Sequence, residues 1–268
     1  MIVILVGFGK ELAVYKNCRK VWDLYYETLN HGDVRIHFCQ TVEHQDQEIF
    51  SEGNDLFVLK RTEDGIKHVN TLNREDSSPR WGDWTIDSNT EVIARQKLST
   101  RWLLNHYKDD CSHIFYTNVT TLLCTKSLKA ICSFLPSRNL YAGSLCKFRE
   151  PFRGVDGFTF ASGAGTLLSS DVASKICEED RLDYLGYPND VWIGSKLFQL
   201  QRTDLPRYDF ERLPHEIDFG SQLAREVNSA LGAGHFHFRA KSKSGRERVD
   251  HLILLEVYKA LSLRAAKE

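Results

Sequence analysis

Several features that would assign the chain to a common protein class are missing from its sequence. Its seven cysteines are odd in number and none belongs to a Cys-x-x-Cys pair, so we expect free thiols in a reducing compartment. Lysine plus arginine (35) balance aspartate plus glutamate (36), which argues against a nucleic-acid partner. The apolar run at residues 2–7 is too short for a signal peptide or a membrane span. We therefore expect a cytoplasmic protein.

Strand patterns and helix patterns alternate along the 268 residues, without an internal repeat. This order predicts a single α/β domain with a mostly parallel central sheet flanked by helices. The predicted strands cover residues 2–9, 33–41, 54–61, 113–119, 139–145, 158–169 and 235–242. The predicted helices cover residues 12–29, 90–107, 126–136, 171–180, 189–200 and 249–263. The polar segment 63–90 is predicted to be a long loop, and loops of that length are usually functional or mobile.

The strand pattern "FTFASGAGTLLS" loses almost all side-chain volume at Ser162, Gly163, Ala164 and Gly165. Glycine inside a strand costs stability, so its presence needs a reason. One explanation is a bulge or a turn. The other is that a ligand must approach the backbone closely at this point.

A partial glycine motif follows the first strand in "GFGKEL". Gly7 and Gly9 match the first half of Gly-x-Gly-x-x-Gly, but Leu12 occupies the third glycine position. A tight turn at the end of the strand is the simpler interpretation. A nucleotide could still lie over this strand end, and a Rossmann-type oxidoreductase is one alternative function.

Asp190 stands at a predicted helix start in "GYPNDVWIG". The helix dipole and the free amides of a first turn favour an ionised carboxylate. The side chain is therefore either an ordinary helix cap or a general base that accepts a proton from an attacking hydroxyl.

Basic and imidazole side chains alternate in the late segment "HFHFRAKS". On a strand, His235, His237, Arg239 and Lys241 would face one side. Such a face could hold a metal and a diphosphate, or it could be a solvated strand face.

Taken in order, "FASGAGTLLSSD", "PNDVWIG" and the late basic strand with its histidine resemble the Fringe and β-1,3-galactosyltransferase-like glycosyltransferases. The resemblance extends over roughly residues 90–255 and includes "NLYAGSL" and "IFYTNVTTLL". It implies a GT-A fold, a nucleotide-sugar donor such as a UDP-sugar, a glycan acceptor and inversion at the anomeric carbon. Residues 1–110 would form the nucleotide-binding half and residues 111–268 the acceptor and catalytic half.

The resemblance also implies roles for individual residues. Asp190 would be the catalytic base, and His237, or less favourably His235, would bind a manganese or magnesium ion. The cleft for the donor would be lined by Gly163, Ala164 and Gly165. Further donor-binding residues would be Gly7, Asn118, Thr120, Arg239 and Lys241.

One departure from the family concerns its Asp-x-Asp metal motif. Asn118 and Thr120 of "YTNVTTLL" stand at those positions and offer only neutral oxygens, which are poor ligands for a hard divalent ion. Either Asn118 and a histidine hold a metal weakly, or Arg239 and Lys241 replace it. A catalytically inactive sugar-binding module is the third functional alternative. The absence of a membrane anchor and disulfides favours a bacterial or viral enzyme over a Golgi enzyme.

Overall fold

The computed structural model describes residues 1–8, 13–43, 45–59, 86–152, 155–178, 189–205, 207–211 and 221–267. Its helical segments are α1 (Ala13–Thr28), α2 (Ile86–Tyr107), the 3-10 turn η1 (Lys108–Asp110), α3 (Thr125–Phe134), α4 (Ser170–Glu178), α5 (Asn189–Lys196), α6 (Ser221–Gly232) and α7 (Arg246–Ala265). Its strands are β1 (Ile2–Gly7), β2 (Val34–Val42), β3 (Ile49–Glu52), β4 (Asp55–Leu59), β5 (His113–Asn118), β6 (Thr121–Leu123), β7 (Tyr141–Phe152), β8 (Val155–Ser169), β9 (Arg202–Asp204), β10 (Arg207–Phe210) and β11 (His237–Ala240).

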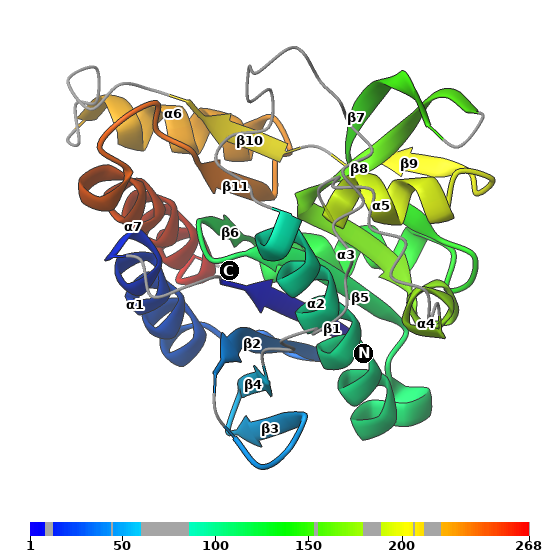
Figure 1. Cartoon of the computed structure of the whole chain (residues 1–268). Helices are drawn as coiled ribbons and strands as arrows, with labels where there is room; N and C mark the ends of the chain where they lie inside the picture. Colours follow the sequence, from blue (N-terminus) through cyan, green and yellow to red (C-terminus); the bar gives the residue numbers. More distant parts are fainter. Residues whose placement is uncertain are drawn as a thin grey trace.

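An eight-stranded sheet forms the centre of the molecule, with the strand order β3-β4-β2-β1-β5-β8-β7-β9 (Figure 1). Four of its seven pairings are parallel, namely β4–β2, β2–β1, β1–β5 and β7–β9. Strands β3 and β8 run antiparallel to their neighbours. The predicted α/β fold with a mostly parallel central sheet is confirmed, and the sheet joins strands from both predicted halves of the chain.

Strand β1 shows why the first segment of the sequence is apolar without alternation. Ile2, Ile4 and Val6 belong to one core cluster, together with α1 and α7. Val3 and Leu5 belong to a second cluster, together with α2 and α4. Because helices cover both faces of the sheet, both faces of its central strand must be apolar.

A second, three-stranded sheet has the order β10-β11-β6. Its strand β6 comes immediately after β5 of the large sheet, with only Val119 and Thr120 between the two strands. Tyr208, Phe210 and Phe238 point from this small sheet into the core shared with α1 and α7. The opposite face carries the polar residues Thr121, Arg207, Asp209, His237 and Arg239, which the register places beside one another. The small sheet itself is seen beside β5 in Figure 1.

Two parts of the sequence-based prediction differ from the structure. Helix α2 begins at Ile86, so the last residues of the predicted loop 63–90 are helical, while residues 63–85 lie outside the described residues. The sequence analysis also missed α6 and the short strands β3, β6, β9 and β10. Strands of three or four residues are too short to display a clear period of two.

Helix α5 packs on β8 through Gly194, which brings Asp190 to that strand. A methyl group added at Gly194 would lie 2.3 Å from Cβ of Phe160. We expect Gly194→Ala to lower the free energy of unfolding by about 1–3 kcal/mol, as overpacking does. Chemical denaturation measures this loss.

The matched control is Gly232→Ala at the end of α6, where no atom lies within 4 Å of the added methyl group. This variant should be neutral or more stable by up to about 1 kcal/mol. Equal effects of the two substitutions would contradict the close packing of α5 on β8.

Candidate active site

The small residues of β8 are in contact with protein side chains. A methyl group added at Gly165 would lie 2.1 Å from Cε1 of His237, so the imidazole ring occupies the space above this glycine. Above Gly163 the nearest side-chain atoms belong to Asn189 and Asp190, at 3.4 Å from an added methyl group. Ala164 is buried, and its carbonyl oxygen accepts a hydrogen bond from Thr117. The pairing of β8 with β7 also changes register here, since Gly143 pairs with Thr166 and Leu145 with Ala161, so the bulge that the sequence allowed is present. Within it the glycines admit His237 and Asp190 to the strand, a contact that the sequence did not reveal.

Asp190 is the second residue of α5 and is fixed to β8 by its carboxylate. Its Oδ2 accepts a hydrogen bond of 2.8 Å from the Gly163 amide, and its Oδ1 accepts one of 2.9 Å from the Val191 amide. Burial raises the pKa of Asp190, while these amides and the Arg239 cation oppose the rise. The result is an oriented carboxylate with a pKa above that of an ordinary aspartate, as a general base requires.

His237 lies at the start of β11, between β8 and the ring of Phe115, whose centroid is 5.2 Å from that of the imidazole. Its exposed fraction is 2%. Burial and the cations Arg207 and Arg239 hold the pKa of His237 well below its usual value. One ring nitrogen bonds the Ala164 backbone, and Nε2 has no partner among the described residues.

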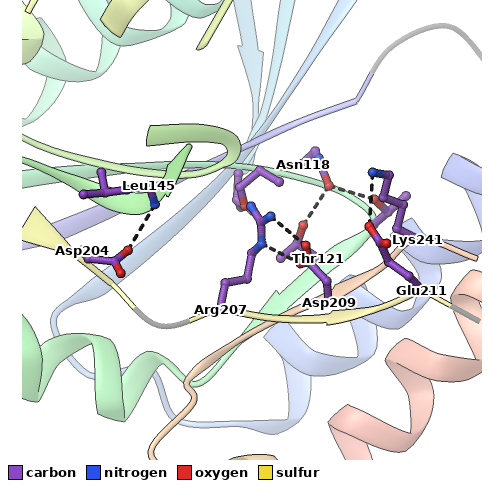
Figure 2. A network of polar contacts seen from close by, with 11 residues as sticks. Asn118, Thr121, Leu145, Asp204, Arg207, Asp209, Glu211 and Lys241 are labelled. Atoms are coloured by element: carbon purple, nitrogen blue, oxygen red, sulfur yellow. Dashed lines mark hydrogen bonds and ion pairs between the residues drawn. The ribbon is translucent and has the colours of Figure 1, made fainter. Parts of the chain in front are cut away.

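Arg207 and Asp209 on β10 are site residues that the sequence analysis missed. The Nε and Nη2 atoms of Arg207 donate to the two carboxylate oxygens of Asp209 at 2.6 and 2.8 Å (Figure 2). In the small sheet, Arg207 pairs in register with His237, and Asp209 with Arg239. The alternation of polar and aromatic residues in "RYDF" was the available signal, but four residues are too few to stand out.

Asn118 and Thr120 lie where β5 turns toward β6. Asn118 Oδ1 accepts a hydrogen bond of 2.8 Å from the hydroxyl group of Thr121 (Figure 2). It accepts a second one, also of 2.8 Å, from the hydroxyl group of Thr120. Thr120 is buried, so its hydroxyl group positions Asn118. Gly7 pairs in register with Asn118 at the carboxyl end of β1, and an added methyl group there would make only ordinary contacts. The role of these residues in donor binding stays a prediction.

The four side chains predicted to share one strand face have different surroundings. His237 and Arg239 lie two residues apart on β11 and face the site. His235 precedes the strand and packs edge-on against Tyr208. Lys241 follows the strand, is half exposed and pairs with Glu211 at 3.3 Å (Figure 2).

The surroundings of Asn118 and His237 do not favour a divalent metal ion. The amide oxygen of Asn118 already accepts two hydrogen bonds, and Arg207 and Arg239 repel a cation near His237. Within the described ranges, no group of three or more His, Cys, Asp or Glu side chains is arranged to hold a metal. Arg207 and Arg239 are the positive charges that the described residues place near His237.

An added methyl group would overlap His237 at Gly165 but would make only ordinary contacts at Gly163. The stabilities of the two alanine variants should therefore differ. We expect Gly165→Ala to destabilise the protein by roughly 1–3 kcal/mol, because the added methyl group forces the His237 ring away from β8. Gly163→Ala serves as the control, since its contacts at 3.4 Å are ordinary. Thermal unfolding measures both variants. Equal stability of the two would show that His237 does not pack on Gly165.

No protein-family model matches the sequence, and no curated protein is detectably similar to it. Among the described helices, none combines the length and hydrophobicity that a membrane span requires.

Three solved structures are partly similar to the chain in backbone course, each with a TM-score below 0.5. A glycosyltransferase involved in glycosylation of the major capsid of PBCV-1 is 8% identical, over 93% of this chain and 98% of that chain, with a TM-score of 0.47. The galactosyltransferase LgtC is 14% identical, over 94% of this chain and 95% of that chain, with a TM-score of 0.45. The glycosyltransferase GlyE of Streptococcus pneumoniae is 11% identical, over 99% of this chain and 63% of that chain, with a TM-score of 0.43. At these identities and TM-scores, no activity or residue role is transferred from those proteins to this chain.

Proposed function

We propose that the chain is a glycosyltransferase that moves a sugar from a nucleotide-sugar donor, expected to be a UDP-sugar, to a hydroxyl group of a glycan acceptor. The observation that carries the proposal is the Asp190 carboxylate, oriented by the Gly163 amide at 2.8 Å and close to the Arg239 cation. A candidate base and a candidate phosphate-binding group thus share one site. The site adjoins the carboxyl end of β5, and α/β sheets bind ligands at this edge.

The resemblance to the Fringe-like glycosyltransferases supports the same activity. Its two motifs contain Gly163 and Asp190, and the structure brings these residues into direct contact. Membership of that family remains a prediction, as does a cytoplasmic enzyme of bacterial or viral origin.

The proposed reaction is a single displacement with inversion. The oxygen of the acceptor hydroxyl forms a bond to the anomeric carbon of the donor. The bond between that carbon and the diphosphate oxygen breaks, and the diphosphate leaves with the electron pair. Asp190 accepts the proton of the acceptor hydroxyl as the new bond forms, because a sugar hydroxyl is too weak an acid to attack unaided.

The two alternative functions predict different ligands. An oxidoreductase would depend on Gly7 and Gly9, but Gly9 and Leu12 lie outside the described residues. A thermal-shift panel separates the possibilities. Stabilisation by UDP or a UDP-sugar supports transfer, stabilisation by NAD or NADP supports the oxidoreductase, and stabilisation by glycan alone supports a sugar-binding module.

Replacing the proposed base tests the function directly. We expect Asp190→Asn to reduce transfer by roughly 10²–10⁴-fold, the usual effect of losing a general base. Donor binding should be nearly unchanged, because the asparagine carbonyl can still accept the Gly163 amide. Thermal stability should fall slightly, because the amide nitrogen cannot accept the Val191 amide, and such a loss is worth about 1 kcal/mol. Donor turnover, measured over a panel of nucleotide sugars, and donor titration are the measurements.

Asp171→Asn is the matched control. Asp171 is also the second residue of its helix, α4, and its carboxylate also accepts a backbone amide, from Asn139. It adjoins Ser169, which pairs with His113 at the opposite end of β5, so transfer should be unaffected. An Asp190→Asn variant as active as Asp171→Asn would remove Asp190 from the mechanism. A product that keeps the donor's anomeric configuration would overturn the single displacement.

The pH dependence of kcat/KM follows from the raised pKa of Asp190. The base must be ionised, so activity should fall as the pH drops through this pKa. The acidic limb should therefore lie above the ordinary aspartate value of about 3.9. The Arg239 cation lowers the pKa of Asp190. Its removal should therefore raise that pKa and move the acidic limb to higher pH. A limb that shifts to lower pH in Arg239→Met would contradict this assignment.

A further inference from the structure

The polar face of the small sheet consists of Thr121, Arg207, Asp209, His237 and Arg239, and it contains buried polar atoms without partners. Nη1 of Arg207, Nε of Arg239 and Nε2 of His237 make no hydrogen bond among the described residues. The Arg207 side chain is only 7% exposed. Buried donors that stay unpaired cost roughly 1–3 kcal/mol each, so a face with several of them is arranged for a ligand.

The charged groups of this face converge on one place. The Cys146 thiol of β7 is close enough to feel the charges of four groups, namely Arg207, Asp209, Arg239 and Asp190. Arg239 in turn feels the charges of Arg207 and Asp209. Arg246, which also repels Arg239, is paired with Asp250, and Lys241 is paired with Glu211. Of the cations within the described ranges of this site, Arg239 therefore remains without an ion-pair partner.

Asp209 occupies two donors of Arg207 and leaves the third nitrogen, Nη1, free. The ion pair thus fixes the plane of the guanidinium group while Nη1 remains available. His237 is different, because its other ring nitrogen bonds the Ala164 backbone and only Nε2 is left without a partner among the described residues.

We infer that the polar face binds the diphosphate of a nucleoside diphosphate through Arg239 and Arg207, with no divalent ion between them. Guanidinium groups suit this role because they offer several donors in a fixed plane and keep their charge when buried. The inference rests on the proposed function for the identity of the ligand. It names Arg207, where the sequence pointed to Lys241, as the second cation.

Asp209 and a diphosphate would compete for the same arginine side chains. The change in ligand affinity caused by Asp209→Asn therefore distinguishes direct binding from binding through a metal ion. If the arginines bind the anion directly, Asp209→Asn removes a competing carboxylate and strengthens binding. If instead a metal ion mediates binding, Asp209 is the carboxylate of this face that would hold it, and Asp209→Asn weakens binding. The two explanations predict opposite signs for one conservative substitution.

The experiment is calorimetric titration of the full chain with inorganic pyrophosphate and with UDP, in EDTA and again with manganese. In EDTA, Arg239→Met should weaken both ligands roughly tenfold to a hundredfold, the effect of losing charge-assisted hydrogen bonds. Arg239→Lys should retain part of the affinity, and Asp209→Asn should bind more tightly. The control Arg35→Met removes an exposed guanidinium group from β2, remote from the small sheet, and should change nothing.

The results that overturn the inference are equally specific. Binding that requires manganese and weakens in Asp209→Asn would show a metal site. Absence of pyrophosphate and UDP binding to the folded wild type would show that the face holds no diphosphate. Turnover of a nucleotide sugar with unchanged UDP affinity in Arg239→Met would reject the inference and keep the proposed function. Arginine-dependent pyrophosphate binding without any turnover would reject the function and keep the anion site.

Discussion

The contact of two side chains with the bare backbone of β8 is the interaction on which the site depends. His237 from β11 covers Gly165, and Asp190 from α5 bonds the Gly163 amide. These contacts join the small sheet and α5 to the large sheet within three residues of one strand. A side chain at Gly165 would separate the imidazole from β8 and with it the polar face from the carboxylate. Close packing here is therefore a requirement of the site's geometry as well as of stability.

Electrostatic demands in the site oppose one another. Burial favours the neutral form of Asp190, while a base must be ionised near neutral pH. Arg239 helps to keep the carboxylate ionised, yet two like charges, Arg207 and Arg239, lie close together in a partly buried place. Asp209 offsets that repulsion through its paired hydrogen bonds to Arg207. Such an arrangement costs folding energy and is typical of functional sites.

The sequence predicted the fold class because the buried strand β1 and the amphipathic helices carry strong local patterns. It also singled out Asp190, His237 and Arg239 as candidate site residues, since each lies in a recognisable segment, and the structure places them near one another. It missed Arg207 and Asp209, because β10 has four residues and its partner strand lies far along the chain. For the glycines of β8 it offered a bulge or a ligand, and the pairing with β7 does change register there. It could not foresee the contact with His237, because a tertiary contact has no local signature. The ion pair that holds Lys241 could not be read from sequence for the same reason.

The order of elements along the chain affects when the candidate site forms during folding. Strand β11 and helix α7 follow all the strands of the large sheet, and α7 packs against α1 at the other end of the chain. Contacts between such distant segments form slowly, because a long loop must close first. The large sheet can thus assemble before His237 and Arg239 arrive. Release of α7 and β11 would dismantle the site while most of the sheet persists, so activity should be lost at milder denaturing conditions than secondary structure.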